Sequence, residues 1–278
     1  MRKFFIENET GSRYALNGEQ GMWFTNPQGL GVTFSSKSAG LSNGFFKPIY
    51  HDTKQNSVTG NITFLRDVYS EYSAFATWLM TAEKLYLIYA PEDVEFYCLV
   101  EVNFITKSEI NRGRWLQTPV SFNMLTPWYK PTPVQFNATP EPDNLMVYPW
   151  RYDNVVYGTL GGNMAVVVPP AGHIPATFEL TYNGACTNPV VLITGQSSQT
   201  VYGRIVVTAS ITTALNISTK YMDSYIRDGA TDILPHVDLS YDPYPRLPMS
   251  EPVVIALSAT GDLEDDMSMY INYYYRTV

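Results

Sequence analysis

The sequence predicts a mainly β protein, and three of its features support that prediction. Aromatic residues make up 14% of the 278 residues, which is typical of strands that pack on a core. The 18 Gly and 19 Pro residues punctuate the chain at short intervals, as turns between strands require. Apolar and polar residues alternate in several segments of both halves, which is the pattern of a half-buried strand. We therefore expect strands joined by many turns, in one large or two smaller β domains.

The first half contains six expected strands and the one expected helix. The helix covers residues 70–82, because Tyr72, Phe75, Ala76 and Leu79 recur at helical spacing and Ser70 can cap the N-terminus. The Gly29-Leu-Gly31 segment is expected to form a tight turn with positive φ. Residues 35–60 are expected to form a long loop or a loose hairpin. The strands are expected at 3–7, 32–34, 61–65, 85–89, 95–105 and 115–124.

A proline-rich segment predicts the division of the chain into two domains. Five prolines between residues 126 and 142 cannot continue a central strand and indicate a semi-rigid linker. We place the boundary at residue 138, with one β domain over 1–138 and a β-sandwich over 139–278 whose last strand can pack back toward the first domain. The strands of the second half are expected at 165–168, 177–182, 190–194, 204–211, 252–257 and 267–275.

The distribution of charge supports the same division. Residues 1–139 carry 12 basic and 12 acidic side chains, whereas residues 140–278 carry 6 and 14, which accounts for the whole net charge of −8. Without clustered Lys and Arg, no stable nucleic-acid binding is expected. An acidic surface can, however, line a conduit for DNA without holding it.

The residues that usually carry chemistry occur in patterns that favour structural roles. Cys98 and Cys186 are expected to be buried small hydrophobes, and the three histidines are scattered singly. The acidic run Asp262–Asp266 lacks the spacing of a calcium loop and is expected to be a hairpin tip. We therefore predict no enzyme activity, no catalytic residues, no metal and no cofactor. No apolar run is long enough to span a bilayer and no signal peptide begins the chain, so we expect a soluble protein made in a cytoplasm.

An aromatic cluster leaves two interpretations open. Tyr148, Trp150, Tyr152 and Tyr157 could fill the seam between the domains, which is the interpretation we favour. Alternatively, Trp150, Tyr152 and Tyr157 could contact a sugar or a partner protein, because CH groups of a pyranose pack on aromatic faces.

Several motifs, in order along nearly the whole chain, resemble one family. They are Phe4-Phe-Ile-Glu-Asn8, Asn26-Pro-x-Gly29-Leu-Gly31, Ile105–Asn111, Arg114–Phe122, Leu125–Tyr129, Thr187-Asn-Pro189, Tyr202-Gly-Arg204 and Tyr273–Val278. Their order and spacing are similar to those of phage distal tail proteins, especially those of phages of Gram-positive bacteria. The chain lacks the long insertion that some members carry in the second half.

The resemblance implies a structural virion protein at the distal end of a phage tail, assembled in the host cytoplasm. Such proteins form a hexameric hub that joins the tail tube to the tail tip or baseplate. Their first domain forms the ring around the DNA channel, and their second is a galectin-like β-sandwich. The implied partners are five further copies, the tail tube protein and a tail-tip or tail-associated protein, with receptor-binding proteins as further candidates. DNA would pass without specific binding, and no membrane insertion is implied. The alternative function is a carbohydrate-binding β-sandwich that contributes to attachment at the host surface.

Overall fold

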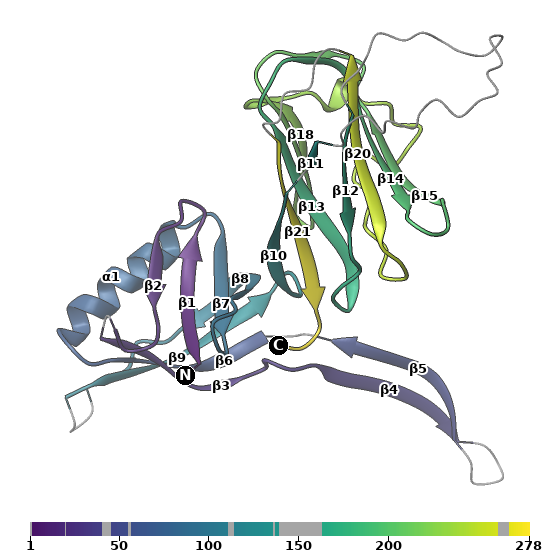
Figure 1. Ribbon diagram of the computed structural model, residues 1–278. Coiled ribbons are helices and arrows are strands. Elements are labelled where there is room, and N and C mark those ends of the chain that lie inside the picture. Colours follow the sequence, from purple (N-terminus) through teal and green to yellow (C-terminus); the bar gives the residue numbers. More distant parts are fainter. Residues whose placement is uncertain are drawn as a thin grey trace, which may run out of the picture. The chain divides into compact units, whose positions relative to one another are not determined.

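The computed structural model describes residues 2–19, 21–40, 46–54, 57–110, 114–135, 137–138, 163–260 and 267–278 (Figure 1). These residues are mainly β with one α-helix, which confirms the predicted fold class. The chain divides into two compact units, with Met1–Lys130 and Tyr275–Val278 in unit 1 and Pro131–Tyr274 in unit 2. Unit 2 is therefore inserted into unit 1, and the chain passes from one to the other twice. Within the described ranges, no helix is long and apolar enough to cross a membrane.

Unit 1 contains an antiparallel sheet that curls so that its two ends meet. Its strands follow the order β2-β1-β7-β8-β9-β6-β3. Leu16 joins the ends, because its N–H donates to Phe4 O (2.8 Å) and its carbonyl accepts from Phe24 N (2.9 Å). The curl encloses the apolar faces of the strands. The strand bounds are β1 Lys3–Asn8, β2 Arg13–Ala15, β3 Met22–Gln28, β6 Ser57–Phe64, β7 Leu85–Ala90, β8 Phe96–Ile105 and β9 Leu116–Met124.

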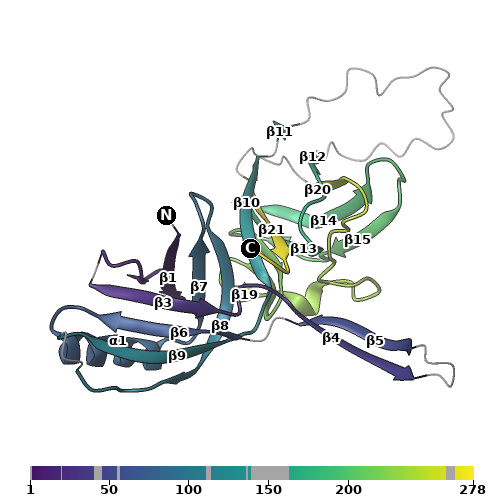
Figure 2. The same ribbon diagram turned by 90° about the horizontal axis from the view of Figure 1, so that it is seen from below.

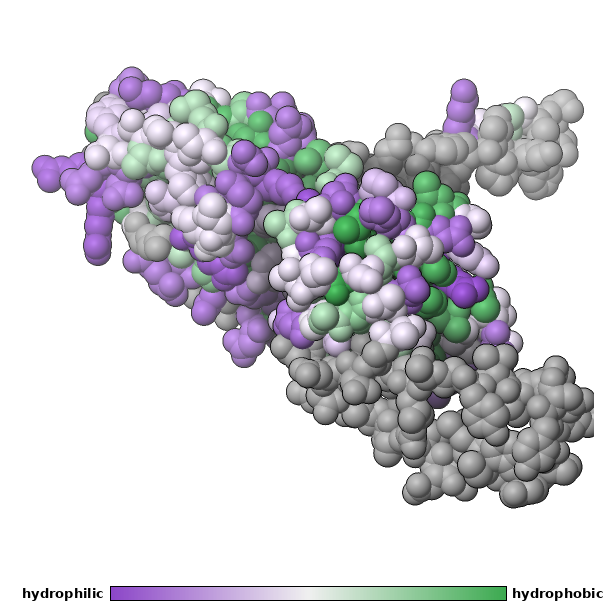
Figure 3. Space-filling model, turned by 90° about the horizontal axis from the view of Figure 1, so that it is seen from above, coloured by the Kyte–Doolittle hydropathy of each residue, from purple (hydrophilic) through white to green (hydrophobic). Residues whose placement is uncertain are grey.

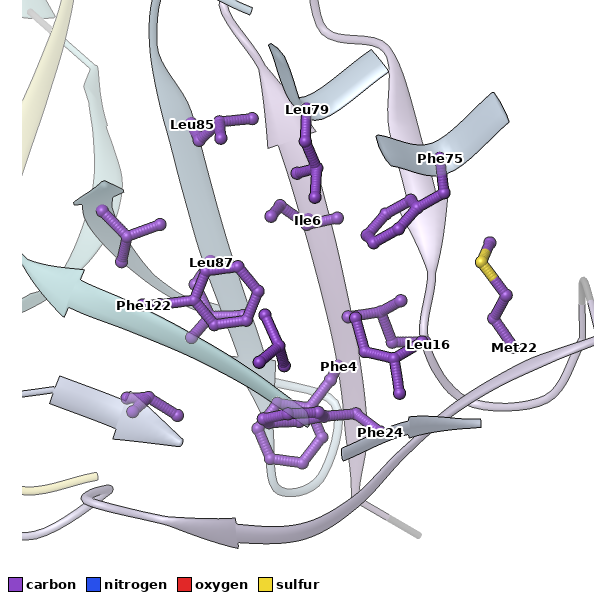
Figure 4. Packing of buried hydrophobic residues seen from close by; sticks show 14 of the residues in the cluster. Phe4, Ile6, Leu16, Met22, Phe24, Phe75, Leu79, Leu85, Leu87 and Phe122 are labelled. Atoms are coloured by element: carbon purple, nitrogen blue, oxygen red, sulfur yellow. The ribbon is translucent and has the colours of Figure 1, made fainter. Parts of the chain in front are cut away.

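Helix α1 (Val68–Thr81) packs on this sheet through the predicted apolar stripe. Phe75 and Leu79 point from the helix toward Ile6 and Leu16 in the core (Figure 4). The prediction that this stripe serves core packing is confirmed. The predicted start was wrong, because the helix begins two residues earlier, after Asp67 at its N-cap, and this places Val68 in the core.

Among the described residues, the first part of the proline-rich segment is a strand and not the linker that the sequence predicted. Residues Trp128–Gln135 form strand β10, which pairs with β8 through Tyr129 and Tyr97 and lies next to β21 (Met267–Tyr275). The residue of β10 that pairs with β8 is Tyr129 and not one of the prolines, so it keeps the N–H that pairing requires. Pro131 and Pro133 follow in the part of β10 that belongs to unit 2. Proline thus restricts which residues of a strand can pair, but it does not exclude the strand.

Unit 2 is a sandwich of two antiparallel sheets (Figures 1 and 2). Their facing sides carry buried side chains such as Phe178, Leu180, Ile193, Ile255 and Ile271. One sheet has the order β19-β18-β17-β13-β21-β10, and the other has the order β11-β12-β20-β14-β15, with β16 beside β14. The bounds are β11 Asn137–Ala138, β12 Asn163–Val168, β13 Ile174–Tyr182, β14 Cys186–Gly195, β15 Val201–Val206, β16 Ser210–Ile211, β17 Leu215–Lys220, β18 Asp223–Asp228, β19 Thr231–Asp232 and β20 Val253–Thr260, with a 3-10 turn η2 at Leu234–His236.

Three features of unit 2 differ from the predicted strands. The expected strand 204–211 is split into β15 and β16. Strands β17 and β18 were not predicted, because each offers few apolar residues on its inner side. In β17 one inner position is Thr219, whose hydroxyl accepts from Phe178 N (2.9 Å) and donates to Phe178 O (3.2 Å). A polar side chain that satisfies its neighbour's backbone can therefore occupy a core position.

Candidate assembly surface

A long hairpin of unit 1 carries two strand edges that no described strand covers. Strands β4 (Thr33–Gly40) and β5 (Phe46–Lys54) pair with each other, from Thr33↔Lys54 to Gly40↔Phe46, in a sheet of their own. Figure 1 shows them extending beyond the other strands of unit 1. The hairpin alternative predicted for 35–60 is thus confirmed, although residues 57–60 belong to β6. Such edges offer rows of backbone donors and acceptors to another chain.

The root of the hairpin is shaped by residues in the left-handed region. Asn26 has φ 51° and Gly29 has φ 85°, so the chain bends as it leaves β3 and enters β4. A Cβ atom on Gly29 would lie 1.9 Å from the carbonyl oxygen of Ser57, so the position requires glycine. The positive φ predicted for this segment occurs at Gly29, whereas Gly31 has an ordinary φ and open space around it.

A cleft of about 590 Å³ lies at this root. It is lined by the end of β3 and the start of β6, together with Phe104 of β8 and Pro119 and Val120 of β9. The pairing of β3 with β6 shifts register between Thr25 and Gln28, and that of β8 with β9 shifts between Val102 and Phe104. A bulge bends its strand and redirects side chains. The strand predicted over 95–105 therefore does not bury Phe104 with its inward-facing residues Cys98 and Val100, and Phe104 is 45% exposed.

The cleft suits an uncharged polypeptide segment. None of its lining residues is ionisable, and the amide side chains of Asn26, Gln28 and Asn61 supply both donors and acceptors. Phe104 adds an apolar ring that the rest of the described chain covers only in part. A backbone edge with small polar side chains could be held here without the cost of desolvating a charge. Sequence reasoning missed this site because a bulge leaves no periodic signal.

The aromatic residues predicted from the sequence, Trp150, Tyr152 and Tyr157, lie outside the described residues, as do Tyr148 and Asp262–Asp266. Their two interpretations stay predictions. The three histidines lie far apart in the sequence. In the described parts of the chain, no group of three His, Cys, Asp or Glu side chains could hold a metal ion.

Both cysteines are buried thiols, as predicted. Burial raises the pKa of Cys98 to about 12 and that of Cys186 to about 11. Both side chains therefore stay protonated near neutral pH, and a protonated thiol is a weak nucleophile. Their environment fits packing rather than covalent chemistry.

Comparison with known proteins supports the family resemblance. Residues 3–125 match the model of the distal tail protein, N-terminal domain. No curated protein matches the sequence. A chain from the structure of the phage P2 baseplate in its activated conformation with calcium is similar over 100% of both chains, with a TM-score of 0.70 and 13% identity. The strontium form of the same baseplate gives the same values.

A second solved structure has the same fold over almost the same length. The SPP1 Dit protein, described as a paradigm of the hub adsorption apparatus in phages that infect Gram-positive bacteria, covers 97% of this chain and 98% of its own, with a TM-score of 0.55 and 10% identity. At such identities the likeness shows the fold. The family match is confined to residues 3–125, which are similar to the N-terminal domain of distal tail proteins.

Proposed function

We propose that this protein is the hub at the distal end of a phage tail, a hexameric ring that joins the tail tube to the tail tip or baseplate. The observation that carries the proposal is the match of residues 3–125 to the distal tail protein domain, supported by the fold shared over the full length with a chain of the P2 baseplate. The role is structural, without catalysis, and the protein resides in the virion after assembly in the host cytoplasm.

The β4–β5 hairpin is the part of unit 1 that best suits ring formation. Its uncovered edges can pair with a neighbouring copy, and closure of a ring covers every such edge by symmetry. The uncharged cleft at its root offers a second contact for the same neighbour. We assign ring formation to residues 1–138. Contact with peripheral proteins, including receptor-binding proteins, is assigned to the galectin-like sandwich of 139–278.

The charge of the chain suits a conduit for DNA. With a net charge of −8 and no basic run, the protein would not hold the phosphate backbone, and DNA could pass through the ring without stalling. A gel-shift experiment at physiological salt should therefore show no complex at micromolar protein.

Light scattering on the full chain, alone and mixed with the tail tube protein of the same phage, tests the proposal. Six copies of 31.4 kDa should give a particle of roughly 190 kDa, visible as a ring by electron microscopy. A monomer in both samples at tens of micromolar would contradict it. Labelled antibodies should bind at the distal end of the tail, and binding elsewhere on the virion would exclude the hub role.

A further inference from the structure

Three neighbouring strands of unit 2 bring together a lysine, a glutamate and an asparagine. Register pairs connect Glu179 of β13 to Ser218 of β17 on one side and to Tyr270 of β21 on the other. Lys220 and Asn272 each follow one of these partners by two residues in the same strand. Because residues two apart in a strand point the same way, all three side chains project to the same side of the sheet.

A single carboxylate oxygen bridges the lysine and the asparagine. Glu179 Oε1 lies 2.8 Å from the ammonium nitrogen of Lys220 and accepts a hydrogen bond of 3.0 Å from Asn272 Nδ2. Both distances end on the same oxygen, so the two nitrogen atoms lie at most 5.8 Å apart, which is the sum of the two distances. The flexible stem of the lysine allows Nζ to approach the amide carbon Cγ of Asn272 without a change in the backbone.

The amide of Asn272 is buried and held by few contacts. Figure 3 shows hydrophilic and hydrophobic residues mixed on the described surface, but Asn272 and its register partner Thr177 are 0% exposed and contribute nothing to it. The amide oxygen of Asn272 has no hydrogen-bond partner among the described residues, and such buried, unpaired acceptors are few in folded proteins. The amide can therefore turn toward Lys220, and water has little access to it.

These three groups are the components of an amide exchange reaction. An amine attacks an amide carbon only after it has lost a proton, and a base within hydrogen-bond reach can remove that proton. Glu179 is within such reach of both the attacking nitrogen of Lys220 and the leaving nitrogen of Asn272. Fixed neighbours on adjacent strands replace a slow bimolecular reaction by an intramolecular one. Exclusion of water prevents hydrolysis of the amide from competing.

We propose that Lys220 and Asn272 form an intramolecular isopeptide bond and that Glu179 transfers the protons. The bond between Nζ and Cγ forms, and the bond between Cγ and Nδ2 breaks. Two protons of the Lys220 ammonium pass through Glu179 to Nδ2, which leaves as ammonium, and Glu179 ends as a carboxylate. Nothing is oxidised or reduced. The bond ties β17 to β21 across β13, and it forms once in each chain, so it adds no turnover and does not depend on the hub role.

Mass spectrometry of the denatured full chain tests this proposal. We expect a mass below that of the sequence by one ammonia, about 17 Da. Lys220 is the only lysine in residues 131–278, and its modification blocks cleavage by trypsin. Trypsin should therefore release one branched peptide that joins residues 205–227 to residues 247–276. An unchanged mass would overturn the proposal, and so would a mass loss without the branched peptide.

Variants assign the role of each side chain. Lys220→Arg keeps the positive charge but cannot form the amide, and Asn272→Ala lacks the amide carbon, so both should have the full sequence mass. The unaltered protein should melt at a higher temperature than Lys220→Arg. Glu179→Gln should slow the reaction by about a hundredfold or more, so that chains of full mass dominate the freshly purified sample.

Asp223→Asn is the matched control for Glu179→Gln. Asp223 is the register partner of Lys220 on β18, but its strand lies three strands away from the strand of Asn272. This variant should therefore keep the mass loss and the branched peptide of the unaltered protein. If Asp223→Asn blocked the reaction as fully as Glu179→Gln does, the proton transfer assigned to Glu179 would be wrong.

Discussion

Two β-hairpins of the chain differ in what covers their edges. In unit 2, the β17–β18 hairpin has β13 along one edge and β19 along the other, and Leu215, Ile217 and Ile226 fasten it to the core. In unit 1, β4 and β5 pair with each other alone among the described strands, and Phe34 is 66% exposed. The first hairpin satisfies its polar backbone within its own chain. The outer edges of the second have no partner strand among the described residues, so we expect them to serve assembly rather than the stability of the fold.

Removal of the β4–β5 hairpin should have the largest effect. If residues 33–54 are replaced by a short Gly-Ser linker, we expect complete loss of the ring and a monomer that stays folded, because the strands of unit 1 retain their own partners. Light scattering measures the mass of the particle, and circular dichroism measures whether the monomer stays folded. A ring that persists after the deletion would disprove the assembly role, and an unfolded monomer would show that the hairpin stabilises unit 1.

A pair of substitutions compares the two hairpins directly. Ile226→Ala in β18 empties a site with 0% exposure and should lower the free energy of unfolding by about 2–5 kcal/mol. Phe34→Ala in β4 should change monomer stability by less than about 0.5 kcal/mol. It should nevertheless weaken assembly, because 66% of Phe34 is exposed and an adjacent copy could cover it. Denaturant unfolding measures the free energy of unfolding, and sedimentation measures assembly. Equal destabilisation of the monomer by both substitutions would contradict the proposed difference between the two hairpins.

The hairpin root offers a sharper test with its own control. Gly29→Ala combines an unfavourable φ with a clash against Ser57 O, and we expect it to destabilise unit 1 by about 1–3 kcal/mol. Gly31→Ala, two residues away, meets no atom within 4 Å and has an ordinary φ, so its stability should stay the same or rise slightly. Thermal unfolding followed by circular dichroism compares them. A harmless Gly29→Ala would show that the bend can relax.

The smallest effect is expected at a turn of unit 2 that a carboxylate closes. Glu251 accepts hydrogen bonds from the hydroxyls of Ser198 and Tyr202 and from the N–H groups of Ser197 and Ser198. These bonds lower the pKa of Glu251 to about 2. Its stabilisation is therefore fully present above the ordinary pKa of 4.5 and is lost as the pH falls toward 2.

Glu251→Gln tests this assignment through the dependence of Tm on pH. The variant should melt below the unaltered protein at neutral pH, and the two melting temperatures should converge as the pH approaches 2. Asp238→Asn is a control, because that carboxyl caps Ser240 in a different loop. A difference in Tm that stays constant from pH 7 to pH 2 would mean that the charge of Glu251 contributes nothing.

The sequence predicted those elements whose residues alternate or recur regularly. The strand at 267–275 was placed at its observed bounds, and the helix within two residues of each end. Strands β17 and β18 were missed because Thr219 occupies a core position, and β10 because its prolines suggested a linker. In each case a specific hydrogen bond or partner strand decides the structure, and a single sequence does not contain that information.

The candidate surfaces were predicted only in part. The segment 35–60 attracted notice through its length and composition, which anticipated the hairpin but not its register. The cleft at the root arises from two register shifts, which a single sequence does not reveal because they appear only when the strands are aligned.

The insertion of unit 2 into unit 1 determines the order in which a newly synthesised chain can fold. Tyr275 packs edge-on against Phe96, with ring centroids 5.5 Å apart, and Val278 contacts the same apolar cluster. Synthesis of the first 130 residues alone therefore leaves unit 1 incomplete. Unit 2 has all of its residues once residue 274 has left the ribosome. Completion of unit 1 thus waits for the synthesis of the whole of unit 2, so a translation product interrupted within unit 2 would lack a finished unit 1.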